Sequence, residues 1–196
     1  MRPETGNREI RKRRMEPLSL EDERIIAEQL GRTPRGLLAV ERRCPYGYPQ
    51  VVRVYPLVEG NPFPTLFWLT CPFLTKQIDR LEAQGWIKQL EELLEEDALA
   101  AHFQKAHLSY INERTRLLSA KDRAFLQRSG TLRNLIEKGI GGTADFGRVK
   151  CLHLHVAHAL ARTNPIGDRV LEALSEHACP PGKVICLKFS QLDRSS

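Results

Sequence analysis

The sequence predicts an α+β fold in which a small antiparallel sheet of three strands is covered by several α-helices in a single domain. Two observations lead to this prediction. Between residues 36 and 70 the hydrophobic residues gather in short runs separated by turn-forming Pro, Gly and Asn, which is typical of strands. After residue 72 they recur with the period of 3.6 residues that is typical of amphipathic helices.

A short helix is expected to precede the strands. Ser19 and Asp22 have the spacing of a capping box, in which the serine hydroxyl accepts a hydrogen bond from an amide of the first turn. A hydrophobic face follows, and Gly31 is expected to end the helix.

Three strands are expected at residues 36–43, 50–57 and 65–70. The segment between the first two, Cys-Pro-Tyr-Gly-Tyr-Pro at residues 44–49, has the turn-forming residues of a hairpin connection. A second turn-rich loop at residues 60–64 precedes the third strand. That strand is expected to be buried, because its hydrophobic residues do not alternate with polar ones.

Helices are expected at residues 73–84, 86–118 (with a candidate break near Asp97), 122–138 (interrupted at Ser129-Gly130), 146–162 and 165–177. Asn164 and Pro165 have the residue types preferred at the cap and first position of the last of these helices. An apolar run at residues 184–187 suits an edge strand. The predicted organisation is a basic, disordered tail at residues 1–17, one domain at 18–178 and a C-terminal tail at 179–196.

Composition excludes several classes of protein. Of the 196 residues, 41% are hydrophobic and 28% are charged, as in globular proteins rather than disordered ones. Uninterrupted apolar runs such as residues 66–69 are far shorter than the roughly 20 residues that cross a membrane. The basic N-terminus is not followed by the apolar run of a secretory signal, so a cytoplasmic protein is expected.

The formal net charge of +6 does not predict nucleic-acid binding, because half of it lies in residues 1–16 and the rest is spread along the chain. A small anionic ligand or a protein partner stays open, and the sequence gives no oligomeric state. The chain has five cysteines. In a reducing cytoplasm these are core residues, metal ligands or nucleophiles rather than disulfides.

The most informative segment is residues 148–162, Arg-Val-Lys-Cys-Leu-His-Leu-His-Val-Ala-His-Ala-Leu-Ala-Arg. With about 100° of rotation per residue, Cys151, His155 and His158 share one stripe of the predicted helix. Arg148 and Arg162 lie at the two ends of the same stripe. His153, the third histidine of this segment, lies instead at the border of the apolar face. Two cysteines nearer the C-terminus, Cys179 and Cys186, are expected to be core residues.

Metal binding is the leading interpretation of this stripe. Thiolate and imidazole are preferred zinc ligands, and Cys44 and Cys71 each end a predicted strand, so that both could approach a helix packed on the sheet. We therefore expect a zinc site formed by Cys44, Cys71, Cys151 and His155, with His158 as a substitute ligand or a base. An iron–sulfur cluster held by the same residues is the lesser alternative.

Three other interpretations stay open. Cys151 could be a nucleophile activated by His158, with Arg148 and Arg162 holding a small anionic, phosphorylated substrate. The chain could instead be a non-catalytic interaction module. Finally, Cys151 and the two histidines of the stripe could be ordinary buried residues, since free cysteine is among the most buried residue types.

Four segments carry a resemblance to a known family: residues 43–49 (Arg-Cys-Pro-Tyr-Gly-Tyr-Pro), 62–72 (Pro-Phe-Pro-Thr-Leu-Phe-Trp-Leu-Thr-Cys-Pro), 149–158 (Val-Lys-Cys-Leu-His-Leu-His-Val-Ala-His) and 164–167 (Asn-Pro-Ile-Gly). With them the chain resembles a bacterial family known as domain of unknown function 501, over roughly residues 20–174. The resemblance implies a small cytosolic bacterial protein. Because genes of the family often lie beside a septum-formation initiator homologue and an exopolyphosphatase, it also suggests a link to cell-division or envelope machinery. It implies no activity.

Overall fold

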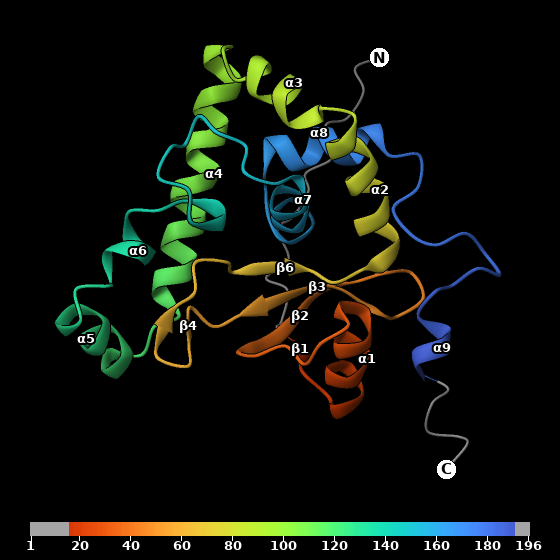
Figure 1. The fold of residues 1–196 in the computed structure, drawn as a ribbon, viewed down its shortest axis with the longest axis horizontal. Helices are drawn as coiled ribbons and strands as arrows, with labels where there is room; N and C mark the ends of the chain where they lie inside the picture. Colours follow the sequence, from red (N-terminus) through yellow and green to blue (C-terminus); the bar gives the residue numbers. More distant parts are fainter. Residues whose placement is uncertain (1–15, 191–196) are drawn as a thin grey trace, which may run out of the picture.

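The structure, a computed structural model, describes residues 16–190 and has the expected α+β fold (Figure 1). Its main sheet is antiparallel with the order β1-β2-β3-β6. The strands are β1 (Glu16–Pro17), β2 (Leu37–Arg43), β3 (Pro49–Val54) and β6 (Phe67–Leu69). A separate hairpin is formed by β4 (Leu57–Val58) and β5 (Asn61–Pro62). The three expected strands are present. The short β1 adds a fourth from the segment that was expected to be a disordered tail, of which residues 1–15 lie outside the described part.

The central strand β3 is buried on both faces of the sheet. Val51 packs with Phe67 in the larger hydrophobic core, on the side of the helices that follow the sheet in the chain. The next residue, Val52, packs with Ile26 in a smaller core on the opposite side. This alternation is the period of two that a strand imposes on its side chains.

The first helix, α1 (Leu20–Leu30), covers that opposite side of the sheet (Figure 1). The predicted capping box is present: Ser19 Oγ accepts from the amide of Asp22, and the Asp22 carboxylate accepts from the amide of Ser19. Gly31 ends the helix in the left-handed conformation, which glycine adopts without steric cost.

The other helices are α2 (Pro72–Ala83), α3 (Trp86–Leu93), α4 (Asp97–Arg116), α5 (Ala120–Arg128), α6 (Arg133–Ile136), the 3-10 turn η1 (Ile140–Gly142), α7 (Leu152–Ala161), α8 (Pro165–Ala173) and α9 (Leu187–Ser190). The candidate break near Asp97 is present, and so is the expected interruption at Ser129-Gly130, which separates α5 from α6. The expected edge strand at 184–187 is not formed, since α9 begins at Leu187. No helix of the described part is long and apolar enough to cross a membrane.

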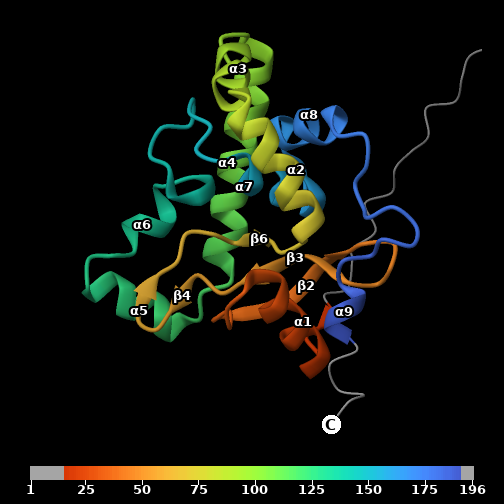
Figure 2. The same ribbon diagram turned by 45° about the vertical axis from the view of Figure 1, so that its right-hand side comes forward.

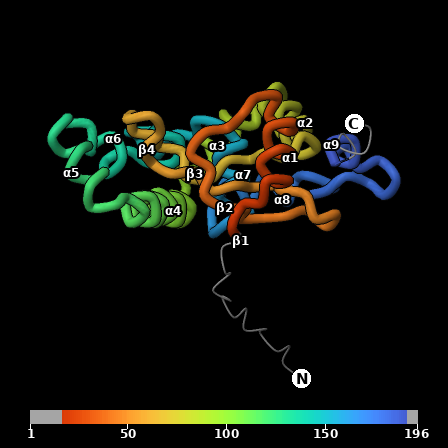
Figure 3. The backbone as a smooth tube through the Cα atoms, turned by 90° about the horizontal axis from the view of Figure 1, so that it is seen from below, coloured from red at the N-terminus to blue at the C-terminus, as the bar shows by residue number. Residues whose placement is uncertain are grey.

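Helix α7 lies at the centre of the helical layer, against β6 and between α2 and α4 (Figures 1 and 2). Seen from below the sheet, α4, α5 and α6 lie at one end of the molecule and α9 at the other (Figure 3). Helix α7 was expected from residue 146 but begins only at Leu152, because Cys151 is extended (φ −166°, ψ 130°). A carboxylate oxygen of Glu82 in α2 accepts the amide of Leu152 at 2.6 Å, which satisfies a free donor of the first turn.

Candidate functional site

The structure does not bring the four expected zinc ligands together. Cys44 lies in the turn between β2 and β3, and Cys71 immediately precedes α2. Cys151 immediately precedes α7 in an extended conformation, so its side chain leaves the helical stripe on which His155 lies. Among residues 16–190, the potential metal ligands whose ligand atoms all lie within 4.8 Å of one another form a different group: Glu82, Cys151 and His153.

His155 and His158 are interior residues, each only 1% exposed. Asn164 connects them, since its Nδ2 lies 3.2 Å from Nδ1 of His155 and 3.1 Å from Nδ1 of His158. The orientation of this amide follows from its other contact, in which its Oδ1 accepts the amide of Gly167 at 2.9 Å. Burial lowers the pKa of both histidines to about 3. The ring contact of Cys151 is with His153, so His158 is not placed as its base.

The two arginines expected to hold an anion already contact carboxylates. Arg148 lies 3.2 Å from Glu91. Arg162 donates to Glu113 at 2.9 and 2.5 Å and to Glu41 at 3.1 Å. Both guanidinium groups therefore have carboxylate partners within the protein.

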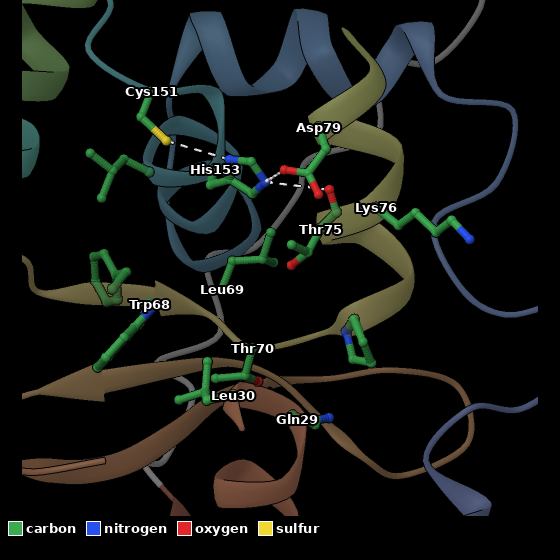
Figure 4. Close-up of a pocket in the computed structure, with 13 residues that line it drawn as sticks. Gln29, Leu30, Trp68, Leu69, Thr70, Thr75, Lys76, Asp79, Cys151 and His153 are labelled. Carbon is green, nitrogen blue, oxygen red and sulfur yellow. Dashed lines mark hydrogen bonds and ion pairs between the residues drawn. The ribbon is translucent and has the colours of Figure 1, made fainter. Parts of the chain in front are cut away.

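The site that the structure does form is centred on the His153 ring (Figure 4). Its Nδ1 lies 3.4 Å from Cys151 Sγ and 3.4 Å from Glu82 Oε1. Its Nε2 lies 3.3 Å from a carboxylate oxygen of Asp79 and 3.3 Å from the carbonyl oxygen of Thr75. One nitrogen of the ring thus faces a thiol and a carboxylate, and the other faces a second carboxylate and a carbonyl.

Two helices position these groups. Thr75, Asp79 and Glu82 are four and three residues apart on α2, so they share one face of that helix. This spacing is visible in the sequence, but only the structure shows that the face points toward the start of α7. Burial by itself would lower the pKa of His153, but the hydrogen bond and charge of Cys151, together with Glu82, outweigh burial and raise the pKa to about 9.

A cavity of about 480 Å³ opens beside Cys151 and His153, between α1, β6, α2 and α7. Leu69 and Trp68 line it from the sheet, and Gln29 reaches it from α1 (Figure 4). Lys76 also lines the cavity, with its amino group directed away from the ring of His153 (Figure 4). A small molecule in this cavity could therefore reach the thiol and the imidazole.

The comparisons with known proteins agree with the resemblance noted in the sequence. A family model described as "Protein of unknown function (DUF501)" matches residues 40–172, which is more than half of the chain and includes Asp79, Glu82, Cys151 and His153. No curated protein and no solved structure matches the chain significantly. The length of the family match shows that the chain belongs to the DUF501 family.

Proposed function

We propose that the protein binds a zinc ion through Cys151 Sγ, His153 Nδ1 and a carboxylate oxygen of Glu82. These three groups supply sulfur, nitrogen and oxygen, the ligand atoms found in protein zinc sites. The proposal keeps the expected metal and Cys151, but it replaces the other expected ligands with Glu82 and His153, which lie beside Cys151.

The observation that supports this proposal most directly is the spacing of the ligand atoms. Zinc bonds of the usual length, at tetrahedral angles, separate a sulfur from a nitrogen ligand by about 3.6 Å and a nitrogen from an oxygen ligand by about 3.3 Å. Around His153 Nδ1 the corresponding distances to Cys151 and Glu82 are both 3.4 Å. An ion could therefore be held with little movement of the side chains.

A second feature favours His153 as a ligand. A histidine that binds a metal through one nitrogen usually donates its other N–H to a carboxylate or a carbonyl, which fixes the tautomer and the direction of the ring. Asp79 and the carbonyl of Thr75 offer both kinds of acceptor at 3.3 Å from Nε2.

Three protein ligands leave one tetrahedral position for water or substrate, which is the pattern of catalytic zinc sites. The cavity beside Cys151 gives a small molecule access to that position. We therefore propose Lewis-acid chemistry on a small substrate, such as activation of water or polarisation of a carbonyl or phosphoryl oxygen.

The second candidate function uses the same residues without a metal. A thiol 3.4 Å from an imidazole whose other nitrogen faces the carboxylate of Asp79 has the arrangement of a thiol nucleophile with an oriented base. This is the thiol–histidine enzyme considered from the sequence, with His153 in the place of His158.

The test is the metal content of the full-length protein, purified without chelator and measured by mass spectrometry, beside three variants. Glu82→Gln is the most informative, because a glutamine oxygen can still accept the amide of Leu152 while the negative charge is lost. We expect Glu82→Gln, Cys151→Ser and His153→Gln each to lower the zinc content by one ion per chain.

The matched controls are Glu92→Gln and His102→Gln, which change the same residue types at exposed positions. They should leave the zinc content unchanged. If the three site variants retain as much zinc as the wild type, the metal site is refuted. Cys151 labelling by iodoacetamide would then test the thiol candidate, which requires His153→Gln to slow the labelling.

A further inference from the structure

The four cysteines outside this site gather at one end of the sheet, where β2 turns into β3. They come from three separate parts of the chain: Cys44 from the turn, Cys71 from the residue before α2, and Cys179 and Cys186 from the segment before α9. Figures 1 and 2 both show α9 and the segment before it beside α1 and this turn.

The carbonyl of Pro49, the first residue of β3, connects two of these cysteines. Gln29 Nε2 donates to this carbonyl at 2.8 Å and also lies 3.3 Å from Cys186 Sγ. The hydroxyl of Thr70, the residue before Cys71, reaches the same carbonyl at 3.4 Å. Cys186 therefore lies beside a side chain that is bonded to this carbonyl, and Cys71 follows a residue that reaches the same carbonyl. Both cysteine side chains are buried.

The other two cysteines are joined through the turn. The Cys44 amide donates to the carbonyl of Tyr48 at 2.9 Å, which closes the turn. The hydroxyl of Tyr46 within it donates to the carbonyl of Cys179 at 2.9 Å. A further bond, from Gln50 Nε2 to the carbonyl of His177 at 2.8 Å, holds the C-terminal segment to β3.

Charge effects agree with this proximity. Burial raises the pKa of Cys71 to about 11, and the neighbouring thiols of Cys186 and Cys179 add to the rise. Burial likewise raises the pKa of Cys186, with Cys44 and Cys179 adding to it. The thiol of Cys71 thus lies near those of Cys186 and Cys179, and the thiol of Cys186 near those of Cys44 and Cys179. A divalent cation among them would replace the thiol protons and hold the sulfurs as thiolates.

We infer that Cys44, Cys71, Cys179 and Cys186 form a closed, four-thiolate site for a soft divalent cation such as zinc. Four sulfur ligands are typical of structural zinc, and the four thiol protons pass to solvent when the ion binds. In the described structure no three of these sulfur atoms lie within 4.8 Å of one another, whereas tetrahedral zinc thiolates need about 3.8 Å. Binding must therefore draw the side chains together, and Cys44 and Cys179 are only half-buried, which allows their rotation.

The site would fasten the segment from His177 to Ser190 to the sheet. It shares no residue with the Cys151 site, so it does not depend on the proposed function. Its ligands also differ in kind from those of the Cys151 site, which has a single thiolate. The two sites should therefore give different absorption spectra when Co²⁺ replaces zinc.

The test is a Co²⁺ titration of the reduced, metal-free, full-length protein, followed by near-ultraviolet and visible absorption. We expect two ions per chain and the intense sulfur-to-cobalt charge-transfer band of several thiolates. The double variant Cys44→Ser/Cys179→Ser changes only half-buried positions, so the fold should be retained. It should bind one ion fewer and lose most of that band. The matched variant Cys151→Ser should also bind one ion fewer but keep the band.

Trypsin digestion gives a second, independent measurement, because Lys183 and Lys188 are exposed in the segment that the site would hold. Zinc should slow cleavage after both lysines at least tenfold in the wild type and not in the double variant. Equal Co²⁺ spectra for the double variant and the wild type, or cleavage that zinc does not slow, overturn the inference. If instead Cys151→Ser binds as many ions as the wild type while the double variant binds one fewer, the proposed function fails and this site stands.

Discussion

Lowering the pH from 7 to 5 is expected to destabilise the protein through three buried histidines. His107, His155 and His158 are at most 1% exposed. Burial lowers the pKa from 6.5 to about 4 for His107 and to about 3 for the other two. As the pH falls through 6.5, the unfolded chain binds protons that the folded chain does not bind until pH 4 or below. The free energy of unfolding therefore falls with the pH in this window.

The size of the effect follows from the pKa difference. Between pH 7 and pH 5, each of the three histidines lowers the free energy of unfolding by about 2 kcal/mol, or about 6 kcal/mol together. His153 acts in the opposite direction, because its pKa is raised to about 9. Its contribution is complete below pH 6.5 and is lost as the pH rises toward 9, so it returns about 1 kcal/mol over the same window. The net loss of about 5 kcal/mol is comparable to the whole stability of many domains.

The hydrogen bonds of Asn164 explain why His155 and His158 stay neutral in the folded state. The amide nitrogen of Asn164 faces Nδ1 of both rings, so each Nδ1 must accept a hydrogen bond and cannot carry a proton. Turning the amide around would offer an oxygen to the rings but would lose the bond that its oxygen now accepts from Gly167. Protonation of either ring therefore places a donor against a donor in a buried position.

The measurement is urea unfolding at pH 7, 6 and 5, followed by tryptophan fluorescence, with a chelator present so that protonation of metal ligands does not contribute. With the opposing contribution of His153 included, the free energy of unfolding should fall by about 1 kcal/mol at pH 6 and by about 5 kcal/mol at pH 5. The variant His107→Gln has one titrating group fewer and should show about two thirds of the histidine effect. A change of less than about 1 kcal/mol between pH 7 and pH 5 would refute the reasoning, because the histidines would then not be held neutral.

Two further predictions concern stability. The Arg114 guanidinium is fully buried and donates to four backbone carbonyls, those of Pro64, Leu135, Lys138 and Gly139. Arg114→Met should cost about 4 kcal/mol or more by leaving them unpaired, whereas the exposed Arg116→Met should cost little; equal unfolding midpoints in urea would contradict this. At Gly167 an added Cβ would lie 2.1 Å from the carbonyl oxygen of His155. Gly167→Ala should therefore lower stability by about 2 kcal/mol or more, and thermal unfolding at the wild-type temperature would exclude the clash.

Local sequence signals were sufficient for much of the fold. The capping box at Ser19, the left-handed Gly31 and the Asn164–Pro165 helix start are all formed by residues close together in the chain, and the structure has each of them. The start of α7 could not be predicted in this way, because the groups that determine it are far apart. Hydrophobic periodicity continues back to Phe146, but a carboxylate from α2, some 70 residues away in the chain, caps the helix at Leu152.

That difference of a few residues changed the candidate site. If Cys151 were within the helix, it would share a stripe with His155 and His158, as the sequence suggested. In its extended conformation it contacts His153 instead, while the two other histidines face Asn164 in the interior. Helical spacing alone cannot show which face of α7 is buried, because that depends on where α2 and α8 pack.

The positions of Cys44 and Cys71 show the same limit for contacts between distant segments. Their places at strand ends suggested that both approach a common point, and the sequence offered α7 as the element they would meet. The element that lies beside them is instead the C-terminal segment, which is held by hydrogen bonds from Tyr46 and Gln50 to backbone carbonyls. Such carbonyls are present at every residue, so nothing in the sequence marks the segment that will bind. A zinc ion at this point would add the specificity that backbone carbonyls lack, because only the cysteines of that segment could hold it.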